Sequence, residues 1–219
     1  METTQPIKDL IHGALIARPI TRTSSPTGWR PQFDDYESSL KLAATACACF
    51  VADMEAGNEP YWLTLQGTFG CGKTMLLRQV FAQAKRINPG NPANNPIWPP
   101  DWDDNEQHCY TGRRPYALIY DEGGLASRMR AGEYNLPREL RDDYFVALDE
   151  IGVTRDPTNF ISEAVSTFCD VRLRGWTMLA TNLSLQEIAE RMDARISSRM
   201  LRDQNKVVCI TAGDYALRT

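Results

Sequence analysis

Short apolar runs rich in aromatic and β-branched residues alternate with segments of helical periodicity from residue 61 onward. The short runs have the length and composition of buried strands, and the longer segments have the apolar spacing of helices. We expect strands over residues 61–67, 116–121, 144–149, 177–181 and 206–211. We expect helices over residues 74–87, 124–133, 159–174 and 184–202. Apolar strands that alternate with helices indicate a parallel sheet covered on both faces, so the predicted fold class is α/β.

The region before the first strand has a different pattern. Residues 1–35 are rich in Thr, Ser, Pro and Arg, which is typical of an arm or a loosely packed extension. Residues 36–56 contain strong helix formers and predict an amphipathic helix that ends at Gly57. Its apolar positions recur at Leu40, Ala43, Ala44, Cys47 and Val51.

Residues 88–115 are rich in Pro, Asn and Asp, and they predict a long loop. The full chain has 219 residues, a length typical of one domain with a short appendage. We therefore expect an N-terminal extension with one helix over residues 1–58 and one domain over residues 59–219.

Composition and charge exclude several classes of protein. Hydrophobic residues make up 42% of the chain and charged residues 24%, which argues against wholesale disorder. The net charge of −4 excludes the class of basic proteins that bind nucleic acid through their overall positive charge. Only five of the 24 basic residues are lysine, and the arginine fork suits a local phosphate site. The scattered cysteines, the absence of a long apolar run and the absence of a secretory cleavage site predict a cytoplasmic protein without a membrane partner.

The turn after the strand over residues 61–67 reads GTFGCGKT and fits the pattern G-x-x-x-x-G-K-[ST]. In such a loop, glycines let successive backbone N–H groups turn toward phosphate oxygens. The lysine reaches the β- and γ-phosphates, the final hydroxyl ligates Mg²⁺, and the following helix adds its positive N-terminal end. We expect ATP and Mg²⁺ to bind here, at residues Gly67, Thr68, Phe69, Gly70, Cys71, Gly72, Lys73 and Thr74.

Such a loop needs an acid at the end of another strand to hold the metal, and the sequence offers two pairs. Asp121 and Glu122 end one strand, and Asp149 and Glu150 end the next. Only the second pair is followed, one strand later, by an amide, Asn182, which can bond the attacking water or the γ-phosphate without adding negative charge. We therefore assign Asp149 to Mg²⁺, with Thr74, and Glu150 to the attacking water. For the first pair we expect a favourable charge near the start of the next helix.

Arg195 and Arg199 lie four residues apart and share one face of the last predicted helix. One reading is an arginine finger, a rigid cation from a neighbouring subunit that neutralises charge on the transferring phosphoryl group. A finger of this kind requires an oligomer. The other reading is a solvated face with local pairing to Asp193 and Asp203.

Taken in order, the segments GTFGCGKT, FVALDEIG, LATNLS and ARISSRM resemble the DnaC/IstB-like branch of the AAA+ ATPases. This branch comprises bacterial and phage replicative-helicase loaders and the ATPase subunits of some transposons. The resemblance covers about residues 60–211 and implies a five-stranded sheet of order 5-1-4-3-2. It also implies that Asn182 is the first sensor residue and Arg199 the primary finger, with Arg195 beside it. Because the chain ends eight residues after the last predicted strand, we expect no C-terminal helical lid.

The resemblance implies an ATP-hydrolysing protein that forms homo-oligomers on single-stranded DNA and loads or remodels a replicative helicase. Arg128 and Arg130 would lie in the helical insertion with which such proteins touch single-stranded DNA. One alternative is a transposition ATPase that selects target DNA for a transposase. Another is an adaptor that ATP switches with negligible turnover, although the intact Asp149–Glu150 pair argues against it.

Overall fold

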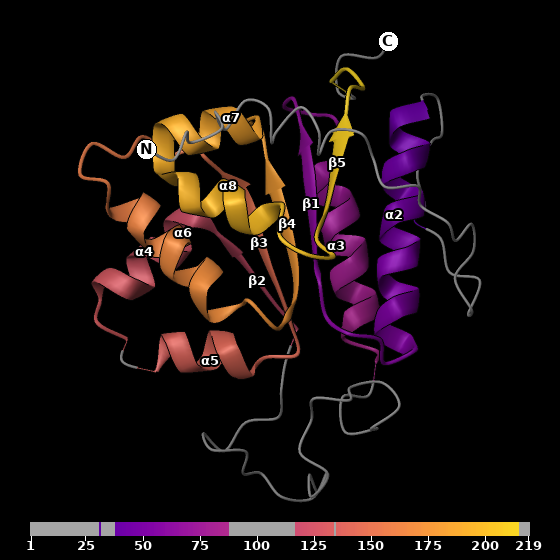
Figure 1. Cartoon of the computed structure of the whole chain (residues 1–219), viewed down its shortest axis with the longest axis horizontal. Helices are drawn as coiled ribbons and strands as arrows, with labels where there is room; N and C mark the ends of the chain where they lie inside the picture. The colour runs from indigo at the N-terminus through magenta and orange to yellow at the C-terminus, as the bar shows by residue number, and fades with distance from the viewer. Residues whose placement is uncertain (1–30, 32–37, 88–116, 134, 215–219) are drawn as a thin grey trace, which may run out of the picture.

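The computed structural model describes residues 31, 38–87, 117–133 and 135–214 (Figure 1). The expected arm over residues 1–35, apart from residue 31, and the expected loop over residues 88–115 lie outside the described residues. Five parallel strands form one sheet in the order β2-β3-β4-β1-β5, which is the predicted order 5-1-4-3-2 read from the other edge. They are β1 (Trp62–Gly67), β2 (Ala117–Asp121), β3 (Phe145–Ile151), β4 (Trp176–Thr181) and β5 (Lys206–Ile210).

Helices cover both faces of the sheet, so the described part of the chain has three layers (Figure 1). One face carries α2 (Ser38–Glu55) and α3 (Lys73–Ala84). The other face carries α4 (Glu122–Arg130), α5 (Leu136–Asp142), α6 (Phe160–Val171), α7 (Leu185–Ile188), the π-helix η1 (Ala189–Asp193) and α8 (Ala194–Met200). Among the described residues, no helix is both long and apolar enough to cross a bilayer.

Successive residues of each central strand pack into hydrophobic cores on opposite faces of the sheet. On β3, Phe145 and Ala147 pack with the core under α2 and α3, whereas Val146 and Leu148 pack with the core under α4 to α8. All four side chains are fully buried. A strand buried on both faces has no polar side to present, which explains why the sequence pattern is continuous rather than alternating.

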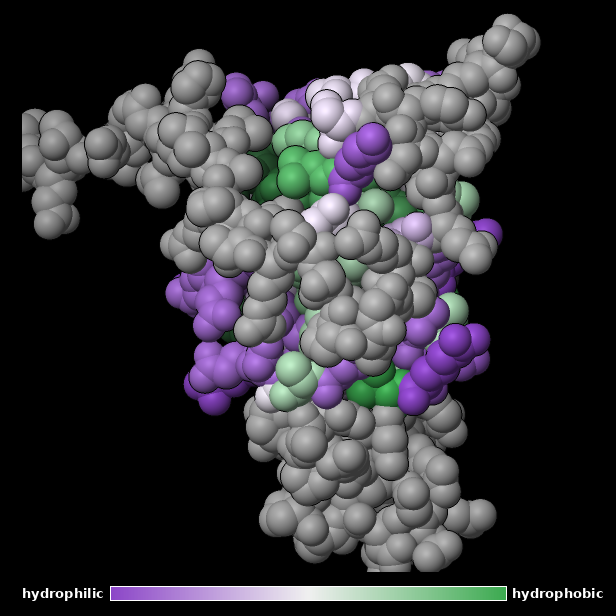
Figure 2. Space-filling model, turned by 90° about the vertical axis from the view of Figure 1, so that its right-hand side faces the viewer, coloured by the Kyte–Doolittle hydropathy of each residue, from purple (hydrophilic) through white to green (hydrophobic). Residues whose placement is uncertain are grey.

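The expected N-terminal helix is confirmed as α2, and it packs against α3 and β5. The Phe50 ring makes edge-to-face contacts with Tyr61 and Trp176, at centroid distances of 5.1 and 5.2 Å. Figure 2 shows the side of the molecule on which α2 lies, where hydrophobic residues are visible between hydrophilic ones. Leu42 of α2 is 40% exposed, so the outer side of this helix is not uniformly polar. The domain boundary at residue 58 stays a prediction.

Two features of the connection between β2 and β3 differ from expectation. Helix α4 begins at Glu122, two residues early, because the Asp121 carboxylate accepts a hydrogen bond from the Gly124 N–H at 2.7 Å and caps the helix. Helix α5 was not expected. It has only seven residues and carries a proline in its first turn, so its sequence shows little helical periodicity.

A buried arginine joins the amino-terminal ends of the strands. The Arg172 guanidinium is 0% exposed and donates to the carbonyl oxygens of Leu140, Asp143 and Trp176 at 2.6, 2.7 and 2.6 Å. It also donates to the Thr177 hydroxyl at 3.2 Å. Burial lowers the pKa of Arg172 to about 10, so the side chain remains a cation at neutral pH. This cation ties the starts of β3 and β4 together.

Candidate functional site

The turn between β1 and α3 is closed around a lysine. Lys73 opens α3, and its ammonium donates to the carbonyl oxygens of Gly67 and Thr68 at 2.9 and 2.7 Å. The side chain is therefore curled into the loop and is only 8% exposed. Gly72 caps α3 with a φ of 98°, a conformation that glycine adopts without strain. The loop presents a cation together with the N-terminus of a 12-residue helix, which is a favourable environment for an anion.

The end of β3 contains a β-bulge at the two predicted acids. Leu148 pairs with Leu179 and Ile151 with Thr181, so Asp149 and Glu150 together face one residue of β4. Asp149 is 7% exposed and accepts a hydrogen bond from the Glu150 N–H at 2.9 Å. Glu150 is exposed and has a φ of 60°. The bulge thus gives two consecutive carboxylates different surroundings, one buried and one open to solvent.

The left-handed backbone of Glu150 is unusual for a residue with a Cβ. Such a conformation costs roughly 1–3 kcal/mol and persists only where the surrounding structure holds it. Strained positions of this kind cluster at functional sites. The strain at Glu150 is therefore a structural reason to regard this residue as functional, independent of the sequence pattern.

The predicted amide lies beside the same bulge. Asn182 follows β4 directly and is half-buried. Its neighbour Thr181 donates a hydrogen bond to the Ile151 carbonyl at 2.9 Å and accepts one from the Leu183 N–H at 3.0 Å. Because β3, β4 and β1 are adjacent parallel strands, their carboxyl ends share one edge of the sheet. The structure brings the loop, the two acids and the amide to that edge.

The two arginines of α8 lie elsewhere. Helix α8 packs on α6, on the sheet face opposite α3. The Arg199 guanidinium, 16% exposed, is ion-paired with the Asp170 carboxylate of α6 and lies 3.4 Å from the Ser166 hydroxyl. Arg195 is 69% exposed, and its hydrogen bond lowers the pKa of Asp193, the N-cap of α8. Arg199 is therefore engaged within its own chain, and Arg195 is the more accessible of the two.

The two arginines predicted to touch DNA both make contacts within the chain. Arg128 donates to the Glu133 carboxylate and the Tyr120 hydroxyl, each at 2.7 Å, and to Glu139 at 3.2 Å. The hydrogen bond from Arg128 lowers the pKa of Glu133. Arg130 lies over the Phe160 ring, 4.6 Å from its centroid. The two side chains thus contact different elements, as their separation by two helical positions requires.

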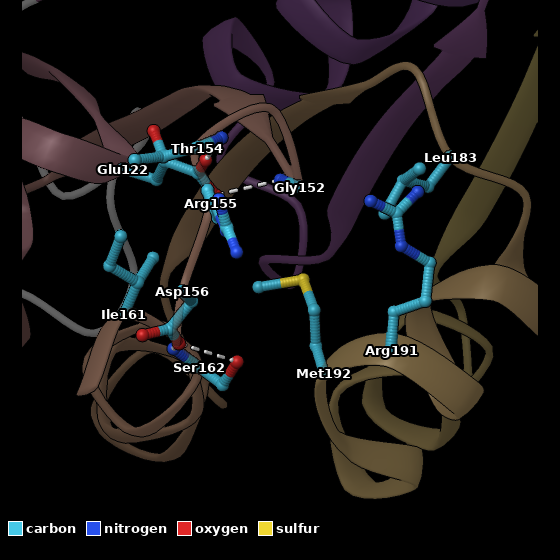
Figure 3. A pocket seen from close by; sticks show the side chains of 10 residues that line it. All are labelled: Glu122, Gly152, Thr154, Arg155, Asp156, Ile161, Ser162, Leu183, Arg191 and Met192. Carbon is cyan, nitrogen blue, oxygen red and sulfur yellow. Dashed lines mark hydrogen bonds between the residues drawn. The ribbon is translucent and has the colours of Figure 1, made fainter. Parts of the chain in front are cut away.

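Sequence reasoning missed the contacts of two acids near the site. The Glu122 carboxylate is 1% exposed and accepts hydrogen bonds from the N–H groups of Gly152 and Thr154 at 2.7 and 2.5 Å (Figure 3). We expected only a favourable charge at the start of a helix. The Asp214 carboxylate lies against the Gly70 backbone in the phosphate loop. No sequence pattern connects either acid with its neighbour, because both contacts join segments far apart in the chain.

The sequence matches no model of a protein family and no curated protein. The structure is similar to the crystal structure of the DnaC helicase loader, with a TM-score of 0.60 and 17% identity over 86% of this chain and 97% of that chain. For DnaI the TM-score is 0.58 and the identity 19%, over 87% and 89% of the two chains. AMPPCP-bound DnaA from Aquifex aeolicus gives a TM-score of 0.51 and 14% identity, over 80% and 47%. These likenesses confirm the predicted fold, an α/β domain with a five-stranded parallel sheet flanked by helices.

Proposed function

We propose that this chain is an ATP-hydrolysing AAA+ protein that assembles on DNA and loads or remodels a replicative helicase. The observation that carries the proposal is the meeting of the phosphate loop, the Asp149–Glu150 bulge and Asn182 at one edge of the sheet. The similarity to the DnaC helicase loader, which extends over 97% of that chain, supports the choice of a helicase as partner. The AMPPCP-bound DnaA supports a nucleoside triphosphate as the ligand.

The phosphate loop would hold the nucleotide through its backbone N–H groups and the Lys73 ammonium. That ammonium now bonds two carbonyl oxygens, so phosphate oxygens would replace neutral acceptors with charged ones. The Thr74 hydroxyl and the Asp149 carboxylate are oxygen ligands of the kind that Mg²⁺ prefers. When bound, Mg²⁺ supplies positive charge to the β- and γ-phosphates.

Glu150 would act on the attacking water. Its carboxylate orients the water and accepts a proton from it, while the water oxygen bonds to the γ-phosphorus and the bond to the ADP oxygen breaks. The exposed Glu150 carboxylate can reach a water beside the nucleotide, whereas the Asp149 carboxylate is buried and already accepts the Glu150 N–H. Asn182 would donate a hydrogen bond to the water or to the γ-phosphate.

Helix α8 carries the residues through which assembly would affect hydrolysis. Because α8 lies on the face opposite α3, Arg199 would act on the nucleotide of a neighbouring subunit, with Arg195 beside it. The proposed finger is ion-paired with Asp170 in the single chain, so engagement requires an exchange of partners. We therefore expect the ATPase activity to be low before the chains assemble.

The proposed DNA contact lies at α4. Arg128 is occupied by three partners, so we assign the larger part of the contact to Arg130, whose charge is not neutralised by the Phe160 ring beneath it. Contacts of this kind bind phosphates and carry little base specificity. The DNA would therefore serve as a platform for assembly, not as a specific site.

Helicase loading onto circular single-stranded DNA tests the proposal directly, because a closed helicase ring cannot thread onto a strand without ends. The purified replicative helicase of the host is mixed with the circle, ATP and the chain. We expect helicase bound to the circle with the wild-type chain and none with Lys73→Ala. Absence of loading and of any helicase complex would refute this function, and a stable complex with a transposase would favour the transposition alternative.

A further inference from the structure

Glu122 forms a link between β2 and the segment that follows Glu150. It is the first residue of α4, directly after β2, and its carboxylate is almost completely buried. Each of its two oxygens accepts one backbone N–H, from Gly152 at 2.7 Å and from Thr154 at 2.5 Å. Figure 3 shows Glu122 beside this segment, which forms one wall of a pocket completed by α6, the β4–α7 connection and η1. Thus a buried charge is satisfied by the backbone that comes two to four residues after the proposed catalytic glutamate.

The opposite side of the segment is held by the connection after β4, which also carries the amide. Gly152 has a φ of 82°, and a Cβ at this position would collide with the Leu183 side chain. Leu183 directly follows Asn182. The segment is therefore clamped between Glu122 and Leu183. No larger residue could replace Gly152 without moving one side of the clamp.

The clamp explains how Glu150 keeps its strained backbone. A left-handed conformation at a glutamate relaxes unless its neighbours are fixed. Hydrogen bonds to an ionised acceptor are stronger than those to a neutral one, and a buried carboxylate is strongly unfavourable unless its oxygens are paired. Both effects favour the observed backbone path at residues 152–154. Glu150, with its φ of 60°, lies two residues before this fixed path.

We propose that Glu122 is a positioning residue that fixes the backbone after Glu150 and so directs the Glu150 carboxylate toward the attacking water. This inference rests on the proposed hydrolytic function. Glu122 itself lies at the start of α4 and acts through the backbone, without touching nucleotide. Its two acceptor oxygens are essential to the role, so the position requires a carboxylate and not merely a polar side chain.

Glu122→Gln is the informative variant, because glutamine keeps the size but offers one carbonyl oxygen and turns an NH₂ group toward the second N–H. Glu122→Ala removes both bonds. Asp121→Ala is the matched control, since Asp121 caps the same helix by accepting the Gly124 N–H and, among the described residues, is not bonded to residues 152–154. It destabilises α4 while leaving the clamp in place.

Two measurements are combined on the full-length chain. Amide hydrogen exchange reports on the segment without requiring hydrolysis. We expect exchange at residues 152–154 to accelerate roughly tenfold or more in Glu122→Gln and Glu122→Ala, and to stay unchanged in Asp121→Ala. In steady-state kinetics we expect kcat of the Glu122 variants to fall roughly 10- to 100-fold, because small misplacements of a catalytic group have effects of this size. ATP affinity should change less than twofold, because the phosphate loop is untouched.

Unchanged exchange in both Glu122 variants would overturn the inference, whatever the rates. Faster exchange with a normal kcat would also overturn it, because Glu122 would then hold the segment without directing Glu150. Loss of kcat in Asp121→Ala equal to that in Glu122→Gln would assign the effect to the helix start instead. A wild-type chain that binds ATP and never hydrolyses it would refute the proposed function, and the exchange data alone would then decide whether Glu122 fixes the segment.

Discussion

Replacing Asp170 with alanine should raise the ATPase rate of the partly assembled protein. In the single chain the Asp170 carboxylate holds the Arg199 guanidinium on the surface of α6. A finger that serves a neighbouring subunit must first leave this partner. Asp170→Ala removes the competing carboxylate and leaves Arg199, α8 and the phosphate loop intact. The prediction is a higher ATPase rate at protein concentrations where assembly is incomplete.

The size of the effect follows from the exposure of the pair. The Arg199 side chain is 16% exposed and that of Asp170 50%, so the pair is partly screened by solvent. Partly exposed ion pairs contribute about 0.5–1 kcal/mol, which corresponds to about a two- to fivefold change in an equilibrium. We therefore expect the rate to rise about two- to fivefold. The gain should shrink as wild type itself approaches full assembly.

The measurement is ATPase rate against protein concentration, with and without single-stranded DNA. Asp142→Ala is the matched control: it removes the acid of a surface pair with Arg138, at 3.6 Å, that is remote from α8. An unchanged or lower rate in Asp170→Ala, with normal thermal unfolding, would refute the idea that this pair withholds the finger.

Three further predictions concern other parts of the molecule. Lys73→Ala and Arg199→Ala should each be inactive alone but regain part of the ATPase rate when mixed, because an intact loop can then meet an intact finger; no recovery at concentrations where wild type assembles would argue against a finger in trans. Arg130→Ala should weaken single-stranded DNA binding and reduce its salt dependence by about one phosphate, with Arg128→Ala having less effect; equal salt slopes in all three proteins would move the DNA contact away from α4. Arg172→Met should lower the free energy of unfolding by roughly 3–5 kcal/mol in urea titrations, because it leaves two buried carbonyl oxygens and one half-buried one without their donor, and a loss below 1 kcal/mol would contradict this account.

The sequence was sufficient for the sheet and for the edge at which the site lies. Strand and helix patterns place the phosphate loop that leads to Lys73, and the residues Asp149 and Asn182, at the carboxyl ends of three strands. In a parallel sheet such ends must meet at one edge, so the proximity of the three residues followed from the order of the strands. Local sequence patterns were therefore sufficient to predict which residues meet at this edge of the sheet.

The contacts that refine the site depend on packing between distant segments. The bulge that separates Asp149 from Glu150 arises from the register with β4, which no local pattern specifies. The bonds from Glu122 to the segment after Glu150 join residues about 30 positions apart, and the Arg199–Asp170 pair joins two helices. A pattern of residue types shows which groups are present, but the partner of each charged group is fixed only when the layers assemble.

Single-turnover hydrolysis by Glu150→Gln, compared with wild type, tests the central claim most directly. ATP affinity is measured in parallel for both proteins, with single-stranded DNA present at concentrations that support assembly. The account predicts that Glu150→Gln binds ATP as tightly as wild type and hydrolyses it at least ~100-fold more slowly, as expected for the loss of a general base. Hydrolysis by Glu150→Gln at the wild-type rate would contradict the assignment of this carboxylate, and with it the active site described for this fold.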